Sequence, residues 1–194
     1  MLFSKGGELV EFFMDGKSLG KTLSGGDGVA FKPFTPERTG LHEIQVKSGG
    51  EEDSGLLLSL KQGMGIVFVD VQGALLEGRF SRKPKPGSRN VIEQISKLHP
   101  VVFLQRGFVS LRMTEEWLKD HEFLNLPVVP WRKGKVFDEV ADMGLRVEAI
   151  IGAGGVIESA MKYGPRSFSF EPVDDKTWVR DWEEIKEELL KDER

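Results

Sequence analysis

Cysteine is absent from the 194-residue sequence, and histidine occurs only three times. The lack of cysteine excludes disulfide bonds, zinc–thiolate sites, iron–sulfur clusters and a cysteine nucleophile. Three histidines argue against a metal site built from several imidazoles. Cysteine-free chains occur in both oxidising and reducing compartments, so this absence does not locate the protein.

Long apolar runs and a strong charge imbalance are also missing. No run approaches the roughly 20 apolar residues of a membrane-spanning helix, so we expect no membrane span. The 27 basic and 31 acidic side chains give a formal net charge of −4, which argues against general nucleic-acid binding. Residues 1–15 lack a secretory signal pattern, which favours the cytoplasm; secretion stays open if a signal preceding Met1 was trimmed.

The first part of the chain, residues 1–62, combines short β-prone runs with turn sequences and has no helical periodicity. Short strands at this spacing predict a small β-sandwich. Between the strands over 41–46 and 56–60 we expect an acidic loop over 49–55. The other expected strands cover Leu9–Met14, Lys17–Leu23 and 29–34.

The second part, residues 63–194, alternates between strand and helix patterns. Its first strand, over 66–69, is a continuous apolar run, as in strands that are buried on both faces of a parallel sheet. The alternation predicts a three-layer α/β domain with a parallel sheet. Further strands are expected over 101–104, 127–130, 147–151 and 167–170. Helices are expected over 91–98, 114–121 with Thr114 as its cap, 135–143, 156–163 and 178–192.

Turn sequences in the first part follow a recognisable order. The motif DGK occupies 15–17, DGVA occupies 27–30, and TP at 35–36 is followed by GLHEI at 40–44. This order resembles bacterial immunoglobulin-like domains, in which His42 takes the place of a usual tyrosine. The resemblance implies a spacer, adhesive or docking module, although a plain sandwich without a ligand fits the same residues.

An aspartate follows the first strand of the second part. Asp70 comes at the carboxyl end of that strand, the edge of an open α/β sheet where ligands bind. The segment DVQGALL at 70–76 resembles the first motif of the haloacid dehalogenase-like (HAD) phosphohydrolases, D-x-D-G-T-L. The resemblance implies that Asp70 holds the nucleophile position, that Gln72 replaces the acid/base and that Ala74 replaces a threonine.

The later motifs come in the order of that family. The next strand ends in Gln105 and Arg106, where the family has a phosphate-binding Thr or Ser that is often followed by Arg. Lys133 or Lys135 stands near the family's motif lysine. The spacing leaves no room for a large inserted cap, so the resemblance implies a capless member.

The segment IIGAGGVIESA at 150–160 resembles the last motif of the family, G-D-x-x-x-D-x-x-A. Ala153 and Ile157 replace its two carboxylates. Gly154 and Gly155 lie where a helix is expected to begin, and backbone amides there are able to bind phosphate.

The replacements remove most of the chemistry that the family uses. There, one aspartate attacks phosphorus, a second transfers protons, hydroxyl and lysine groups hold the phosphoryl oxygens, and Mg²⁺ neutralises charge. An amide at Gln72 does not exchange protons near neutral pH, and Asp70 alone would offer Mg²⁺ a single carboxylate, a weak site. The resemblance therefore implies a non-catalytic pseudo-phosphatase that needs no cofactor and serves as a binding or scaffolding module for a protein partner or for self-association.

Two alternatives remain open for the second part. A non-hydrolysing sensor would hold a phosphorylated small molecule, and a slow Mg²⁺-dependent phosphatase would use Asp70. If neither applies, Asp70 is a vestigial residue that is hydrogen-bonded to backbone amides. The residues expected to bind a phosphorylated ligand are Gln105, Arg106, Lys133, Lys135, Gly154 and Gly155.

Overall fold

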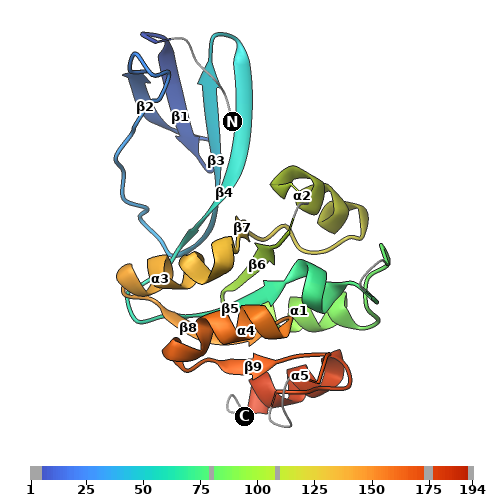
Figure 1. Ribbon diagram of the computed structural model, residues 1–194. Helices are drawn as coiled ribbons and strands as arrows, with labels where there is room; N and C mark the ends of the chain where they lie inside the picture. The colour runs from blue at the N-terminus through green and yellow to red at the C-terminus, as the bar shows by residue number, and fades with distance from the viewer. Residues whose placement is uncertain (1–5, 79–80, 108–109, 173–176, 192–194) are drawn as a thin grey trace. The chain divides into compact units, whose positions relative to one another are not determined.

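A computed structural model describes residues 6–78, 81–107, 110–172 and 177–191 (Figure 1). The chain divides into two compact units, Met1–Leu60 and Lys61–Arg194, and each is described by itself. Within the described ranges, no helix has the length and apolar character that crossing a membrane requires.

The first unit contains an antiparallel sheet with strand order β2-β1-β3-β4 (Figure 1). Two tight turns with positive φ at both central residues build it: Asp15 and Gly16 join the first hairpin, and Gly49 and Gly50 join the second. Such turns match the natural twist of paired strands. The strands are β1 (Leu9–Met14), β2 (Lys17–Leu23), β3 (Gly40–Ser48) and β4 (Glu51–Ser59).

Two predictions for this unit are wrong. The strand expected over 29–34 does not form, since Pro33 offers no backbone donor and the Val29 amide donates to the Asp27 carboxylate at 3.0 Å. The acidic loop expected over 49–55 is largely strand, because the two-residue turn lets pairing start at Glu51. The described residues of this unit form one sheet, whereas a sandwich requires two, so the predicted β-sandwich is not confirmed.

A buried histidine joins the first hairpin to the start of β3. His42 is 1% exposed, and its Nδ1 lies 2.8 Å from Asp15 Oδ2 while its Nε2 lies 3.0 Å from the Arg38 carbonyl oxygen. Both partners are acceptors, so this arrangement favours the charged imidazole, in which both ring nitrogens donate. The hydrogen bond to Asp15 is the main cause of the raised pKa of His42. The same bond, with help from Arg38 and the Glu43 amide, lowers the pKa of Asp15 to about 2.

The charged form of His42 makes the stability of the protein depend on pH. A histidine whose folded pKa is raised stabilises the fold fully below its unfolded pKa, about 6.5, and this contribution is lost as the pH rises through the folded pKa. We therefore expect a decline in stability above about pH 6.5 that the variant His42→Gln lacks. Denaturant unfolding across this range measures it, with His121→Gln as the control. Equal pH profiles for wild type and His42→Gln would contradict the assignment.

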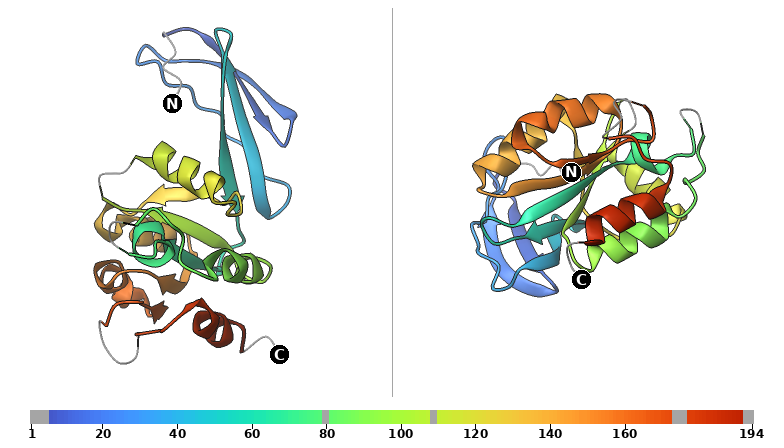
Figure 2. Two further views of the ribbon diagram at one scale, coloured as in Figure 1. Left: turned by 90° about the vertical axis from the view of Figure 1, so that its right-hand side faces the viewer. Right: turned by 90° about the horizontal axis from the view of Figure 1, so that it is seen from below.

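The second unit is a mixed α/β fold around a five-stranded parallel sheet with order β7-β6-β5-β8-β9. Seen along the sheet, helices lie on both of its faces, which confirms the predicted layered α/β architecture (Figure 2). The strands are β5 (Gly65–Asp70), β6 (Val101–Gln105), β7 (Val128–Pro130), β8 (Arg146–Ile151) and β9 (Arg166–Phe168). The helices are α1 (Ser88–Ser96), α2 (Leu111–Asp120), α3 (Lys135–Asp142), α4 (Gly154–Ala160) and α5 (Trp182–Leu190).

Four of the five helices start at other residues than the sequence predicts: α1 and α4 begin three and two residues earlier than expected, and α2 and α5 also differ. Helix α2 begins at Leu111, because the Ser110 hydroxyl accepts the Met113 amide at 3.2 Å; Thr114 therefore lies inside the helix and is not its cap. Helix α5 begins at Trp182, with Asp181 as its cap. The residues expected to precede it in the helix form other contacts, such as the bridge of Trp178 to Ser169.

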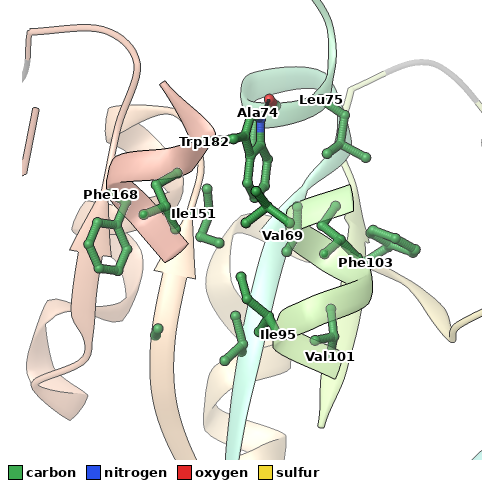
Figure 3. Close-up of a cluster of buried hydrophobic side chains, with 14 of the residues drawn as sticks. Val69, Ala74, Leu75, Ile95, Val101, Phe103, Ile151, Phe168 and Trp182 are labelled. Carbon is green, nitrogen blue, oxygen red and sulfur yellow. Dashed lines mark hydrogen bonds between the residues drawn. The ribbon is translucent and has the colours of Figure 1, made fainter. Parts of the chain in front are cut away.

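The core of this unit joins the sheet to the turn that follows β5. Trp182 of α5 is 1% exposed, and its indole Nε1 donates to the carbonyl oxygen of Ala74 at 3.3 Å. Ala74 belongs to a π-helical turn, Val71–Leu75, which comes directly after Asp70. Figure 3 shows Trp182 beside Ala74, with Val69 of β5 and Ile151 of β8 in the same cluster. The last helix of the unit thus holds the segment next to the candidate site.

Candidate functional site

The strand order defines one crevice in which the α/β unit can hold a ligand. After β5 the chain builds β6 and β7 on one side, and it then crosses to build β8 and β9 on the other side (Figure 1). The carboxyl ends of β5 and β8 therefore lie at a topological switch point, where open α/β sheets bind ligands. Asp70 ends β5, and Gly152 and Ala153 follow β8.

Asp70 is fully buried at this point, with an exposed fraction of 0%. The backbone amide of Ala153 donates to its Oδ2 at 3.2 Å. Two glycines allow this close approach: a Cβ at Gly73 would lie 2.3 Å from Asp70 Oδ2, and one at Gly152 would lie 2.7 Å from Asp70 Cβ. Real side chains do not tolerate such distances, so the site depends on glycine at both positions.

A cation from the neighbouring strand faces the same carboxyl. Arg106, directly after β6, places its Nε 3.2 Å from Asp70 Oδ2, in an ion pair that lacks the alignment of a hydrogen bond. The backbone amide of Arg106 donates to Gln72 Oε1 at 2.9 Å. The structure therefore brings Asp70, Gln72 and Arg106 together, and of the predicted site residues these three form one cluster.

Opposing effects act on the pKa of the Asp70 carboxyl. Burial raises its pKa above the usual range, because it disfavours the charged form; the charge of Arg106 and the amides of Ala153, Gly73 and Gln72 act in the opposite direction. The Oδ1 atom of Asp70 is buried and has no hydrogen-bond partner among the residues that the structure describes. A buried polar atom without a hydrogen-bond partner destabilises the folded state, and such atoms are often found at functional sites.

The other predicted ligand residues lie around this cluster and are not shown to contact it. The Gln105 side-chain amide donates to the Gly107 carbonyl oxygen at 3.3 Å. Lys133 and Lys135 are exposed in the segment after β7. Gly154 and Gly155 form the first turn of α4, which is only seven residues long.

The segment that carries Lys133 is unusual in its backbone. Arg132, Lys133 and Gly134 all have positive φ, of 47°, 54° and 90°. A Cβ at Gly134 would lie 2.7 Å from the Cβ of Ser159, whose hydroxyl accepts the indole N–H of Trp131 at 3.0 Å. Left-handed non-glycine residues cost free energy and persist where surrounding contacts fix them. The segment is therefore held in one shape by α4.

The resemblance to HAD phosphohydrolases implies Mg²⁺, and the residues present do not fit it. Asp70 is the one carboxylate of the cluster, while Ala153 and Ile157 are buried and apolar. No group of three or more histidine or acidic residues suited to a metal occurs among the described parts of the chain. Mg²⁺ takes six oxygen ligands in octahedral geometry. Here Asp70 Oδ2 already faces the guanidinium of Arg106.

Several contacts within this cluster were not predicted from the sequence. The ion pair of the Arg106 side chain with Asp70 was not predicted from the sequence, which favoured Arg106 as a ligand-binding residue. Ala153 was treated only as a lost carboxylate, whereas its backbone amide holds Asp70. Gly73 and Gly152 gave one usable signal, since each follows a buried strand at the edge where backbones approach ligands closely.

The packing around Asp70 predicts different effects for two glycine substitutions. Gly73→Ala would place its Cβ 2.6 Å from the Ala153 nitrogen, and overpacking of this kind costs about 1–3 kcal/mol. Gly155→Ala is the control, because nothing lies within 4 Å of its Cβ and alanine favours a helix by roughly 0.5–1 kcal/mol over glycine. Chemical denaturation measures both. Equal stability of the two variants would show that the site is not packed in this way.

Comparison with known proteins adds no family to this geometry. No protein-family model matches the sequence, and no curated protein matches it significantly.

Proposed function

We propose that the α/β unit is a HAD-like pseudo-phosphatase, a binding or scaffolding module without hydrolytic activity. The observation that carries the proposal is the state of the Asp70 carboxyl. It lies at the switch point of the sheet, where a nucleophile would be needed, but it is fully buried and faces Arg106 and the Ala153 amide. The position of Asp70 fits a HAD-like origin, and its contacts fit a site that does not hydrolyse a substrate.

Nucleophilic attack on phosphorus needs an accessible carboxylate and a partner that transfers protons. The Asp70 carboxyl is fully buried and already faces Arg106 and the Ala153 amide, so it is not accessible to a substrate. Gln72, two residues later, has an amide whose oxygen accepts the Arg106 backbone N–H. That amide offers no proton at neutral pH, so neither requirement is met by the cluster.

The first unit supports a second part of the proposal, an immunoglobulin-like spacer or docking module. In immunoglobulin-like sandwiches a tyrosine near the start of a strand bonds to the backbone a few residues upstream. His42, near the start of β3, makes the equivalent bond to the carbonyl oxygen of Arg38. The antiparallel hairpins of the unit are compatible with this type of domain.

A protein partner or self-association is supported by exposed apolar side chains on the first unit. Leu9, Leu23 and Phe31 are 54%, 63% and 77% exposed. Among the described positions of this unit, Val10 is the one apolar residue that is buried. A sheet with so little buried apolar surface gains stability when another surface covers it.

Hydrolysis assays test the proposed function directly. We expect no release of phosphate from p-nitrophenyl phosphate above the background rate, with or without Mg²⁺, because the cluster lacks a free nucleophile and a proton donor. The matched control is Asp70→Asn, which should give the same background. Mg²⁺-dependent hydrolysis that Asp70→Asn abolishes would establish the slow phosphatase instead.

The second candidate, a sensor of phosphorylated small molecules, is supported by cations at the carboxyl edge of the sheet. The Arg106 side chain is 32% exposed, and Lys133 and Lys135 are exposed after β7. Such cations attract phosphate without any need for hydrolysis.

Thermal-shift measurements with phosphomonoesters test the sensor. A ligand at 100 times its Kd stabilises the folded state by about 2.7 kcal/mol, which corresponds to a rise in Tm of roughly 5 °C or more. The rise should shrink in Lys133→Ala and persist in Lys97→Ala, since Lys97 lies at the amino edge of the sheet, just after α1. An equal loss in both variants would point to general charge attraction.

A further inference from the structure

We propose that Arg106 supplies Asp70 with the positive charge that a divalent ion would supply at a metal-dependent site, so that the buried aspartate is stabilised without a metal ion. The inference builds on the proposed function, because it explains how the same site can keep a buried aspartate without Mg²⁺. It is carried by the contacts of Asp70, Gln72 and Arg106.

Asp70 needs a compensating charge. Its carboxyl is fully buried, and a buried carboxylate is stable only when it is paired or hydrogen-bonded. Among the described residues, Arg106 is the cation that lies within salt-bridge distance, with 3.2 Å between Nε and Oδ2. A guanidinium stays charged at every pH at which proteins fold, so this compensation is permanent.

The backbone of Arg106 is fixed on both sides. Register places Leu104 of β6 opposite Asp70, so Arg106 lies two residues beyond the level of the aspartate. Its amide donates to Gln72 Oε1, and the preceding carbonyl oxygen, of Gln105, accepts the Trp131 amide at 3.0 Å. Gln72 is thus a positioning residue for Arg106. This gives a role to a residue for which the family resemblance implies only a loss.

A divalent ion would have to compete with this arrangement. Asp70 Oδ2 is already engaged by the Ala153 amide and by Arg106. An ion at Oδ1 would lie close to the guanidinium, and like charges repel strongly where water is excluded. The apolar side chains of Ala153 and Ile157 provide no further oxygen ligand.

The test uses the full chain and a cycle of charge-removing variants. Arg106→Met keeps an unbranched side chain, although a shorter one, and removes its charge, and we expect its Tm to fall by roughly 5 °C at neutral pH. The loss should be much smaller in an Asp70→Asn background, where no carboxylate is left for Arg106 to pair with. Arg106→Lys, the matched control, keeps the charge and should lose less than Arg106→Met. If Arg106→Met does not fold, a folded Asp70→Asn/Arg106→Met double variant supports the charge pairing equally.

Metal dependence is measured in the same assay. MgCl₂ should shift the Tm of the wild type and of Asp70→Asn equally, relative to NaCl of the same ionic strength. The inference is overturned if Mg²⁺ stabilises the wild type and not Asp70→Asn, or if Arg106→Met costs as much with Asp70→Asn as without it. Metal-free turnover of a phosphomonoester would instead overturn the proposed function and leave this inference standing.

Discussion

A carboxyl group with no exposed surface has to be compensated from within the protein, and this constraint organises the α/β unit around Asp70. The compensation comes from three directions: the Arg106 side chain after β6, the Ala153 amide after β8, and the amides of Gln72 and Gly73 in the turn directly after β5. Glycines at 73 and 152 let these groups approach. The contacts that compensate Asp70 therefore also link β5, β6 and β8 at the carboxyl edge of the sheet.

Much of this unit could be predicted from the sequence, because strands buried on both faces leave continuous apolar runs. The runs that became β5, β6 and β8 are of this kind, and Asp70 follows directly from the end of the first. Local patterns were less reliable at helix starts. Both Ser110 and Thr114 are able to cap a helix, and only the hydrogen bond of Ser110 to Met113 decides between them.

The contacts within the site could not be predicted, because they join residues far apart through groups that leave no pattern. The Ala153 amide that holds Asp70 is a backbone group, available at any residue except proline. Pairing of Arg106 with Asp70 depends on the register between β5 and β6. In the first unit, the start of β4 depends on where the turn at Gly49 and Gly50 closes, whereas its acidic residues alone favour a loop.

The bond from Trp182 to Ala74 has a consequence for the order in which the chain is made. These residues are 108 positions apart, and Ala74 belongs to the turn beside Asp70. On the ribosome the turn emerges long before its partner, at a synthesis rate of about 5–20 residues per second. For several seconds the carbonyl of Ala74 lacks the indole that later covers it. The site is thus begun early in synthesis and completed only when α5 has docked.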